Sequence, residues 1–159
     1  MVTLAAARSA VARVIDPEIP VLTIDDLGIL RNVEIEGSTV IVTITPTYSG
    51  CPAMSMISAD IEAALHEAGF DHVDVRTVLS PAWTTDWMGE DAKRRLAEYG
   101  IAPPGHTASG GPTLVQLGVR CPHCGSVNTR EHSRFGSTAC QAQFICAACG
   151  EPFDHFKAH

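Results

Sequence analysis

The sequence predicts an α+β fold, in which a small mixed β-sheet with packed helices is followed by a small β-rich metal ribbon. Two observations predict this arrangement. Helical and β-strand patterns alternate along the N-terminal part of the chain, as they do where helices form a layer on a sheet. Two Cys-X-X-Cys pairs then follow near the C-terminus, in a module too short to have much of a hydrophobic core.

The first elements are a helix and a hairpin. Apolar residues recur at helical spacing over residues 3–15, and Pro17 stops the helix because proline disfavours helical geometry in the residue before it. Residues 29–35 and 39–45 are rich in β-formers, and the short polar stretch between them is typical of a hairpin turn. These residues are expected to start the sheet.

The next elements predict a crossover connection. A second helix is expected to begin with Cys51 as its N-cap and Pro52 as its first residue, and to end at Gly69. Residues 73–79 form the third strand, which the right-handed crossover places parallel to the second. A last short helix is expected over residues 89–99.

Composition predicts two domains with different charge. Residues 1–104 form the α+β domain, residues 105–114 a linker rich in Gly, Pro, Ser and Thr, and residues 115–159 the metal ribbon. The first domain has a net charge of −8 and the rest of the chain +1. An acidic body argues against nucleic acid as a partner. The sequence contains neither a membrane span nor a secretion signal, so a cytoplasmic location is expected.

The C-terminal cysteines have the spacing of a metal site. Cys121, Cys124, Cys146 and Cys149 form two pairs with 21 residues between them, which suits four thiolate ligands on two facing loops. Free thiols or disulfides are the alternative. Zinc is the expected metal, and an iron–sulfur cluster is the alternative. Cys140 lies within the same module and is either a buried core residue or an additional ligand.

A second candidate site surrounds the sixth cysteine. At the start of a helix, Cys51 is exposed to the positive end of the helix dipole, which suits a nucleophile or a metal ligand. A buried cysteine at the joint between strand and helix is the alternative. Asp16 and Glu18 flank Pro17 and form either a solvated turn or part of a site. Trp83 is expected in the core.

These pieces together resemble a known family. Residues 16–30, residues 43–52 with Cys51 after a glycine, and residues 80–83 resemble the SufT/PaaD-type family of iron–sulfur assembly domains. Residues 135–140 and 149–156 narrow the resemblance to the branch that is encoded with the ring-1,2-phenylacetyl-CoA epoxidase of phenylacetate degradation. The resemblance covers nearly the whole chain and implies the fold of an iron–sulfur assembly domain.

The resemblance also implies roles for particular residues. It makes Cys51 the residue for cluster or metal transfer, and it assigns Asp16 and Glu18 to the same site. Many relatives have Asp-Pro-Pro-Trp where this chain has Ser80-Pro81-Ala82-Trp83, so the acid of that loop is missing here.

The implied function is that of a non-catalytic maturation factor for the epoxidase, which assists insertion of an iron–sulfur cluster or iron through Cys51. The implied partners are iron–sulfur assembly proteins and a subunit of the epoxidase, either its diiron oxygenase or its iron–sulfur/flavin reductase. The alternative is a non-catalytic structural subunit of the epoxidase complex. A thiol enzyme is disfavoured, because the sequence places no histidine partner near Cys51.

Overall fold

The structure is a computed structural model that describes residues 2–105 and 118–158. Residues up to Trp83 form one compact unit and residues from Thr84 on form another, here called the first and second unit. The boundary expected after residue 104 stays a prediction. Of the expected linker, residues 105–114, the described part of the chain includes residue 105 alone. Residues 115–117, which belong to the expected ribbon, also lie outside the described part.

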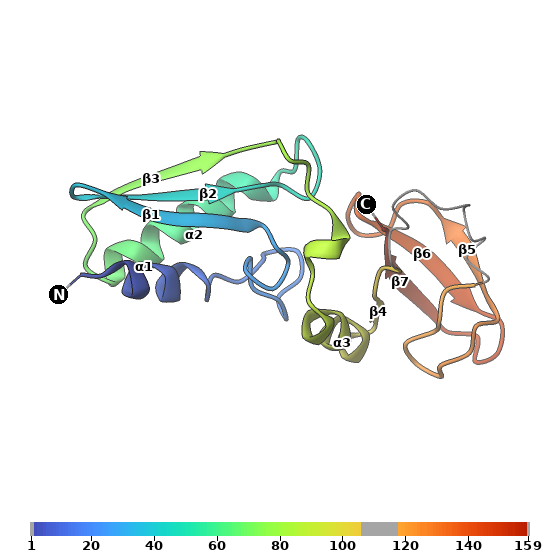
Figure 1. The fold of residues 1–159 in the computed structure, drawn as a ribbon. Coiled ribbons are helices and arrows are strands. Elements are labelled where there is room, and N and C mark those ends of the chain that lie inside the picture. The colour runs from blue at the N-terminus through green and yellow to red at the C-terminus, as the bar shows by residue number, and fades with distance from the viewer. Residues whose placement is uncertain (1, 106–117, 159) are drawn as a thin grey trace. The chain divides into compact units, whose positions relative to one another are not determined.

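The first unit contains a three-stranded mixed sheet (Figure 1). Its strands are β1 (Leu30–Glu36), β2 (Thr39–Ile44) and β3 (His72–Thr77), in the order β1-β2-β3. β1 and β2 form the expected antiparallel hairpin, and β2 pairs in parallel with β3. The crossover between the parallel strands runs through α2 (Ala53–Glu67), which confirms the expected connection.

Two helices cover one face of this sheet (Figure 1). α1 (Leu4–Val11) is shorter than the expected helix over 3–15. It ends early because the chain after it turns to make a bridge between Ile15 and Thr23, and the Ile24 N–H donates to the Val14 carbonyl at 2.9 Å. α2 buries the apolar stripe that its periodicity predicts, namely Ala53, Ile57, Ile61 and Leu65.

The second unit is built on a separate sheet. The helix expected over 89–99 is α3 (Glu90–Tyr99), and Gly100 ends it in the left-handed conformation with a φ of 97°. The remaining elements of this unit are η1 (Thr85–Trp87), β4 (Ile101–Ala102), β5 (Thr129–Ser133), β6 (Gln141–Cys146) and β7 (Pro152–Phe156), with the strands in the order β4-β7-β6-β5. The chain continues from α3 directly into β4, which pairs in parallel with β7.

One hydrophobic cluster of the second unit lies at the Cys-X-X-Cys pairs. It consists of Ala102, Val119, Cys121, Cys146 and Phe153, with Phe144 packed against it. Two of these five buried residues are cysteines of the Cys-X-X-Cys pairs. A metal bound by these cysteines would therefore add to the stability of this part of the unit.

Candidate metal centre and lone-cysteine site

The second unit brings four cysteine sulfur atoms together. The Sγ atoms of Cys121 and Cys149 lie 3.9 Å apart and those of Cys124 and Cys146 lie 3.6 Å apart. All four sulfur atoms lie within 4.8 Å of one another. Zinc–thiolate bonds of about 2.3 Å in a tetrahedron require sulfur atoms about 3.8 Å apart. The four side chains therefore have the donor type, number and spacing of a tetrahedral metal site.

Each Cys-X-X-Cys pair is followed by a glycine that completes the turn. Gly125 and Gly150 have φ values of 78° and 79°, which disfavour any residue with a Cβ atom. Their N–H groups donate to the carbonyl oxygens of Cys121 and Cys146, each at 2.9 Å. The two loops thus have the same backbone geometry. Neither glycine was among the expected site residues, although the repeated Cys-X-X-Cys-Gly pattern is a signal for both.

The thiols of the four-cysteine group differ in acidity. The backbone N–H of Cys149 is the main reason why the pKa of Cys146 is lowered to about 7. The backbone N–H of Glu151 favours the Cys149 thiolate, but desolvation and the three neighbouring thiols outweigh it and raise the pKa of Cys149 to about 12. Four thiolates so close together repel one another, and a divalent cation among them would remove that repulsion and displace the remaining protons.

Other candidate ligands of the second unit lie outside the four-cysteine group. Cys140 is buried, and its Sγ lies 2.9 Å from the Thr138 hydroxyl. His155 is buried with its ring centroid 5.3 Å from that of Phe144, and burial lowers its pKa to about 4. Among the described residues, Cys121, Cys124, Cys146 and Cys149 alone form a group that could hold a metal ion.

Cys51 lies in the first unit, immediately before α2. The structure corrects the expected N-cap, because Pro52 occupies that position and makes no side-chain capping hydrogen bond. Cys51 is one residue further out, where its N–H donates to the Tyr48 carbonyl at 3.3 Å and its own carbonyl accepts from Met54 at 3.3 Å. Gly50 before it has a φ of 82°. The thiol is half-buried rather than fully covered.

Asp16 is a buried carboxylate with a structural role. It is only 5% exposed, and its Oδ1 accepts hydrogen bonds from the N–H groups of Glu18 and Ile19, both at 2.8 Å. Asp16 is buried in this turn, whereas Glu18 is partly exposed to solvent. Burial raises the pKa of Asp16 despite these two donors. Burial and the charge of Asp16 together raise the pKa of Glu18. This turn is therefore not simply solvated.

The structure brings Cys51 within electrostatic reach of both acids. Burial raises the pKa of Cys51, against a lowering hydrogen bond from the Ala53 backbone, and the negative charges of Glu18 and Asp16 raise it further. A hydrogen bond with the Tyr48 side chain favours the thiolate. Residues from two distant parts of the sequence thus influence the pKa of one thiol.

Trp83 fixes the loop after β3 to the first unit. Its side chain is 5% exposed, and its Nε1–H donates to the Leu27 carbonyl at 2.8 Å, across 56 residues of sequence. The expected core position of Trp83 is confirmed. The hydrogen bond ties the loop of residues 80–83 to the turn that follows the Asp16 segment.

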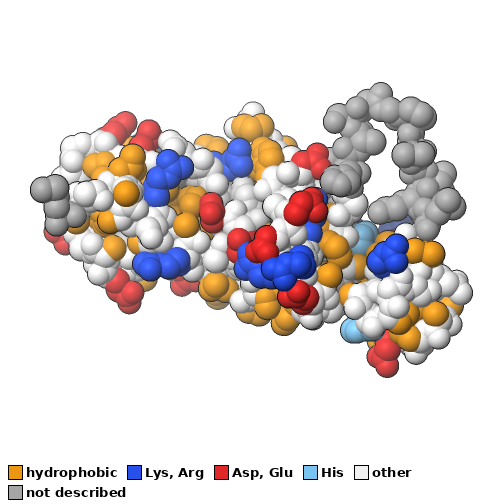
Figure 2. All heavy atoms as spheres, turned by 60° about the horizontal axis from the view of Figure 1, so that its bottom comes forward, with side chains coloured by type: hydrophobic (Ala, Val, Ile, Leu, Met, Phe, Trp, Pro, Cys, Tyr) orange, Lys and Arg blue, Asp and Glu red, His pale blue; other side chains and the backbone are white. Residues whose placement is uncertain are grey.

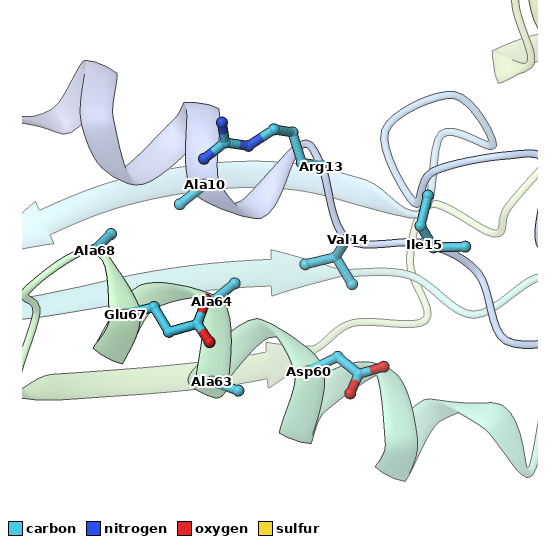
Figure 3. A pocket seen from close by; sticks show the side chains of 9 residues that line it. All are labelled: Ala10, Arg13, Val14, Ile15, Asp60, Ala63, Ala64, Glu67 and Ala68. Carbon is cyan, nitrogen blue, oxygen red and sulfur yellow. The ribbon is translucent and has the colours of Figure 1, made fainter.

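A groove of about 590 Å³ lies between α1 and α2 (Figure 3). Alanines and Val14 line its floor, Arg13 lies on the α1 side, and Asp60 and Glu67 lie on the α2 side. The groove is lined by none of the residues Cys51, Asp16 and Glu18, so it is separate from the lone-cysteine site.

Surface charge and helix composition are the features that are relevant to binding of nucleic acid or insertion into a membrane. Acidic and basic side chains are mixed on the face shown in Figure 2, without a continuous basic stripe. In the part of the chain that the structure describes, no helix is both long enough and apolar enough to cross a bilayer.

Two known protein families match two different parts of the chain. Residues 4–78 match a family described as iron–sulfur cluster assembly protein, and residues 106–157 match the PaaD zinc β-ribbon domain. A protein of Escherichia coli strain K12 is 53% identical over 89% of this chain and 85% of its own length. That relative is named as one of the subunits of a "Putative 1,2-phenylacetyl-CoA epoxidase".

One further relative and one solved structure each match somewhat more than half of the chain. The "Fe-S protein maturation auxiliary factor" of Porphyromonas gingivalis is 36% identical over 52% of this chain and 80% of its own length. The solved structure of "Domain of Unknown Function DUF59" from Bacillus anthracis has a TM-score of 0.54 and 27% identity, and covers 58% of this chain and 90% of that one. The expected α+β fold with a C-terminal ribbon is confirmed. The chain belongs to the PaaD (PaaJ) family, whose members join an iron–sulfur cluster assembly domain to a zinc β-ribbon.

Proposed function

We propose that this protein is a non-catalytic accessory factor that delivers an iron–sulfur cluster or iron to a component of phenylacetyl-CoA epoxidase. Cys51 is the ligand that holds and releases the cargo, with Asp16 and Glu18 beside it. The four-cysteine group holds a structural zinc ion. The client is the diiron oxygenase or the iron–sulfur/flavin reductase, and the donor is an iron–sulfur assembly protein.

The single observation that carries the proposal is the contrast between the two kinds of cysteine site. The four cysteines of the ribbon supply a complete tetrahedral shell, and a closed shell of this kind holds its metal permanently. Cys51 is a half-buried thiol that belongs to no complete set of ligands among the described residues. Cargo bound there keeps open coordination positions, through which a client's ligands can take it over.

The charges around Cys51 suit transient binding of a cation. Burial raises the pKa of the Cys51 thiol, and the charges of Glu18 and Asp16 raise it further, so the thiol carries a proton near neutral pH and is a poor nucleophile. The same negative charges attract an iron cation or a cationic cluster, which displaces the proton on binding. When the cargo leaves, the proton returns, and this return favours release. The arrangement fits a carrier better than a thiol enzyme.

The names of relatives support both parts of the proposal. The Porphyromonas gingivalis relative is named a maturation auxiliary factor for Fe–S proteins, and it matches about half of this chain. The Escherichia coli relative, which covers most of the chain, is named for the epoxidase. Zinc is the metal that the ribbon's name implies, and four thiolates at this spacing fit it.

The test compares the wild-type chain with Cys51→Ser. The variant should keep its fold and one zinc ion per chain, because the ribbon does not involve Cys51. It should lose uptake of iron and sulfide, measured as visible absorbance after anaerobic reconstitution. It should also fail to support epoxidase activity in cells that lack the native protein. Normal support by the variant would exclude the delivery role, and turnover of phenylacetyl-CoA by the purified wild-type chain would exclude a non-catalytic one.

The word "subunit" in the name of the Escherichia coli relative favours a second candidate function. In that case the chain is a structural, non-catalytic part of the assembled epoxidase. It would then co-purify with the oxygenase in a fixed ratio through gel filtration, and Cys51→Ser would leave activity intact. A carrier would be absent from the active complex.

A further inference from the structure

The groove between α1 and α2 has two walls of opposite charge (Figure 3). The lining residues of α2 share one face of that helix, and they are Asp60, Ala63, Ala64, Glu67 and Ala68. The other wall consists of Ala10 on α1 and of residues 13–15, which follow that helix. Arg13 is the charged residue of this wall, so a basic wall lies opposite an acidic one. All of these residues belong to the first unit.

The floor of the groove is apolar and consists of short side chains. Ala63 and Ala68 are exposed on the surface of α2, and Ala10 and Val14 are buried beside them. Ile15 also lines the groove and is 46% exposed, although it is large and apolar. Short side chains let a third helix approach closely, with one row of its side chains in the groove. The floor therefore suits the apolar face of an amphipathic helix, which is a common form of recognition between proteins.

The charged side chains of the two walls specify the charges of an occupant. Arg13, Asp60 and Glu67 are exposed, and none of them forms an ion pair within the described part of the chain. Asp60 and Glu67 are seven residues apart, which is about 10 Å along α2. Two basic residues seven positions apart on a helix that lies along α2 would meet both acids, and an acidic residue on its other edge would meet Arg13. Ion pairs at the edges of a helix contact determine which helices pair and in which direction.

A convex helix suits the groove better than a second copy of the chain or a small molecule does. Two copies related by a two-fold axis would place the same groove opposite itself. Two facing hollows leave a void, which is unfavourable because packed interiors and interfaces contain few voids. A small molecule is bound by polar groups that converge on it, whereas the two acids of this groove lie about 10 Å apart along α2.

We propose that this groove docks an amphipathic helix of the protein that exchanges metal with Cys51. The apolar face of that helix packs on the alanine floor, two basic residues seven positions apart pair with Asp60 and Glu67, and an acidic residue pairs with Arg13. α2 begins at Ala53, directly after Pro52, and Asp60 lies about 10 Å further along it. A helix docked along α2 would hold its protein near the thiol. The identity of the partner rests on the proposed function, whereas the chemistry of the docked helix rests on the groove alone.

The test uses a synthetic helical peptide as the probe, with two lysines seven positions apart on one edge of a leucine and alanine stripe and a glutamate on the other edge. The control peptide has each of these charges reversed. Each peptide is titrated into the zinc-loaded full chain by fluorescence anisotropy, and NMR at the methyl groups of Val14 and Ile15 locates the binding site. The probe should bind about tenfold more tightly than the control at low salt, because it forms three exposed ion pairs. Equal affinities, or no shifts at these two residues, would overturn the proposal.

Charge-reversed variants distinguish the groove from general attraction by an acidic surface. Asp60→Lys combined with Glu67→Lys should reverse the preference, so that the control peptide binds more tightly. Glu62→Lys combined with Asp71→Lys changes the net charge equally at exposed positions that do not line the groove, and it should keep the preference. Docking in the groove is excluded if the first variant keeps the preference or the second one loses it.

Three further measurements separate this proposal from the delivery role and from self-association. Cys51→Ser should keep the preference for the probe peptide, whether or not Cys51 delivers metal. In cells, the combined Asp60→Lys and Glu67→Lys variant should weaken support of epoxidase activity, while iron uptake by the purified variant stays normal. Full support by that variant would overturn the assignment to the partner that exchanges metal. In sedimentation velocity, a wild-type dimer that the same variant abolishes would show that a second copy occupies the groove, and would also overturn the proposal.

Discussion

Replacement of Asp16 by alanine and by asparagine separates the structural role of this carboxyl group from its charge. Oδ1 of Asp16 accepts from Glu18 and Ile19 at 2.8 Å each, and Ile19 is only 2% exposed. Alanine leaves both donors without their acceptor. A buried donor that has lost its acceptor destabilises the folded state by about 1–3 kcal/mol. The Glu18 N–H lies at the low end of this range because its hydrogen bond is only partly buried. Asp16→Ala should therefore destabilise the first unit by about 2–4 kcal/mol.

Asp16→Asn should behave differently, because the amide oxygen can accept the same two hydrogen bonds without a buried charge. Burial raises the pKa of Asp16 above its usual value of 3.8, so the folded state binds the proton more readily than the unfolded state. The stability that this carboxyl group contributes is fully present below pH 3.8 and is lost as the pH rises through the folded pKa. At pH 7, Asp16→Asn should equal or exceed the wild type in stability.

The assay is urea denaturation followed by the fluorescence of Trp83, in a Trp87→Phe background that leaves Trp83 as the one tryptophan. Trp83 is a suitable reporter because it is buried in the same unit as Asp16. An Asp16→Ala variant within about 0.5 kcal/mol of the wild type would refute the argument from the two hydrogen bonds. An Asp16→Asn variant as unstable as the alanine variant would refute the argument from buried charge.

Two other predictions concern the acidity of Cys51 and the metal of the ribbon. Glu18→Gln should lower the pKa of Cys51 more than Asp16→Asn does, because the charge of Glu18 raises that pKa more than the charge of Asp16. The pKa of Cys51 is measured from the pH dependence of its alkylation by iodoacetamide. A pH profile that is unchanged in Glu18→Gln would contradict the prediction. Cys149→Ser should release the ribbon metal, detected by elemental analysis, whereas Cys140→Ser should retain it because Cys140 lies outside the four-cysteine group. Retention of metal by Cys149→Ser would show that the ligand assignment is wrong.

Local sequence patterns predicted the elements of the first unit because helices and hairpins are determined mainly by residues that are close together in the sequence. The hairpin of β1 and β2 follows from two β-rich runs with a turn between them, and its bounds lie within one residue of those expected. The parallel pairing of β2 with β3 follows from the length of the helical connection. The N-cap was expected one residue too early, because proline is most frequent at the first helical position, whereas Pro52 is the N-cap here.

Contacts between distant segments were beyond these patterns. β4 has only two residues, and it pairs with β7 across about fifty residues of sequence. A strand of two residues has no periodicity, so its place in a sheet could not be predicted from the sequence. The burial of Asp16 was equally hidden, although an Asp followed by Pro17 is a known signal for a turn closed by its side chain. No described residue forms a hydrogen bond with the Thr45 hydroxyl, and this could not be predicted because it depends on all the side chains packed around Thr45.

The two cysteine sites differ in how many ligands the chain supplies, and this difference sets what each can do. A carrier must bind its cargo less tightly than its client does, or transfer would be unfavourable. Four thiolates from one chain give an affinity that few clients could exceed. One thiol with a raised pKa gives a much weaker site, because part of the binding free energy is spent on removing its proton. The single thiol of Cys51 is therefore compatible with the proposed delivery role, whereas the four-cysteine group is suited to a metal that stays bound.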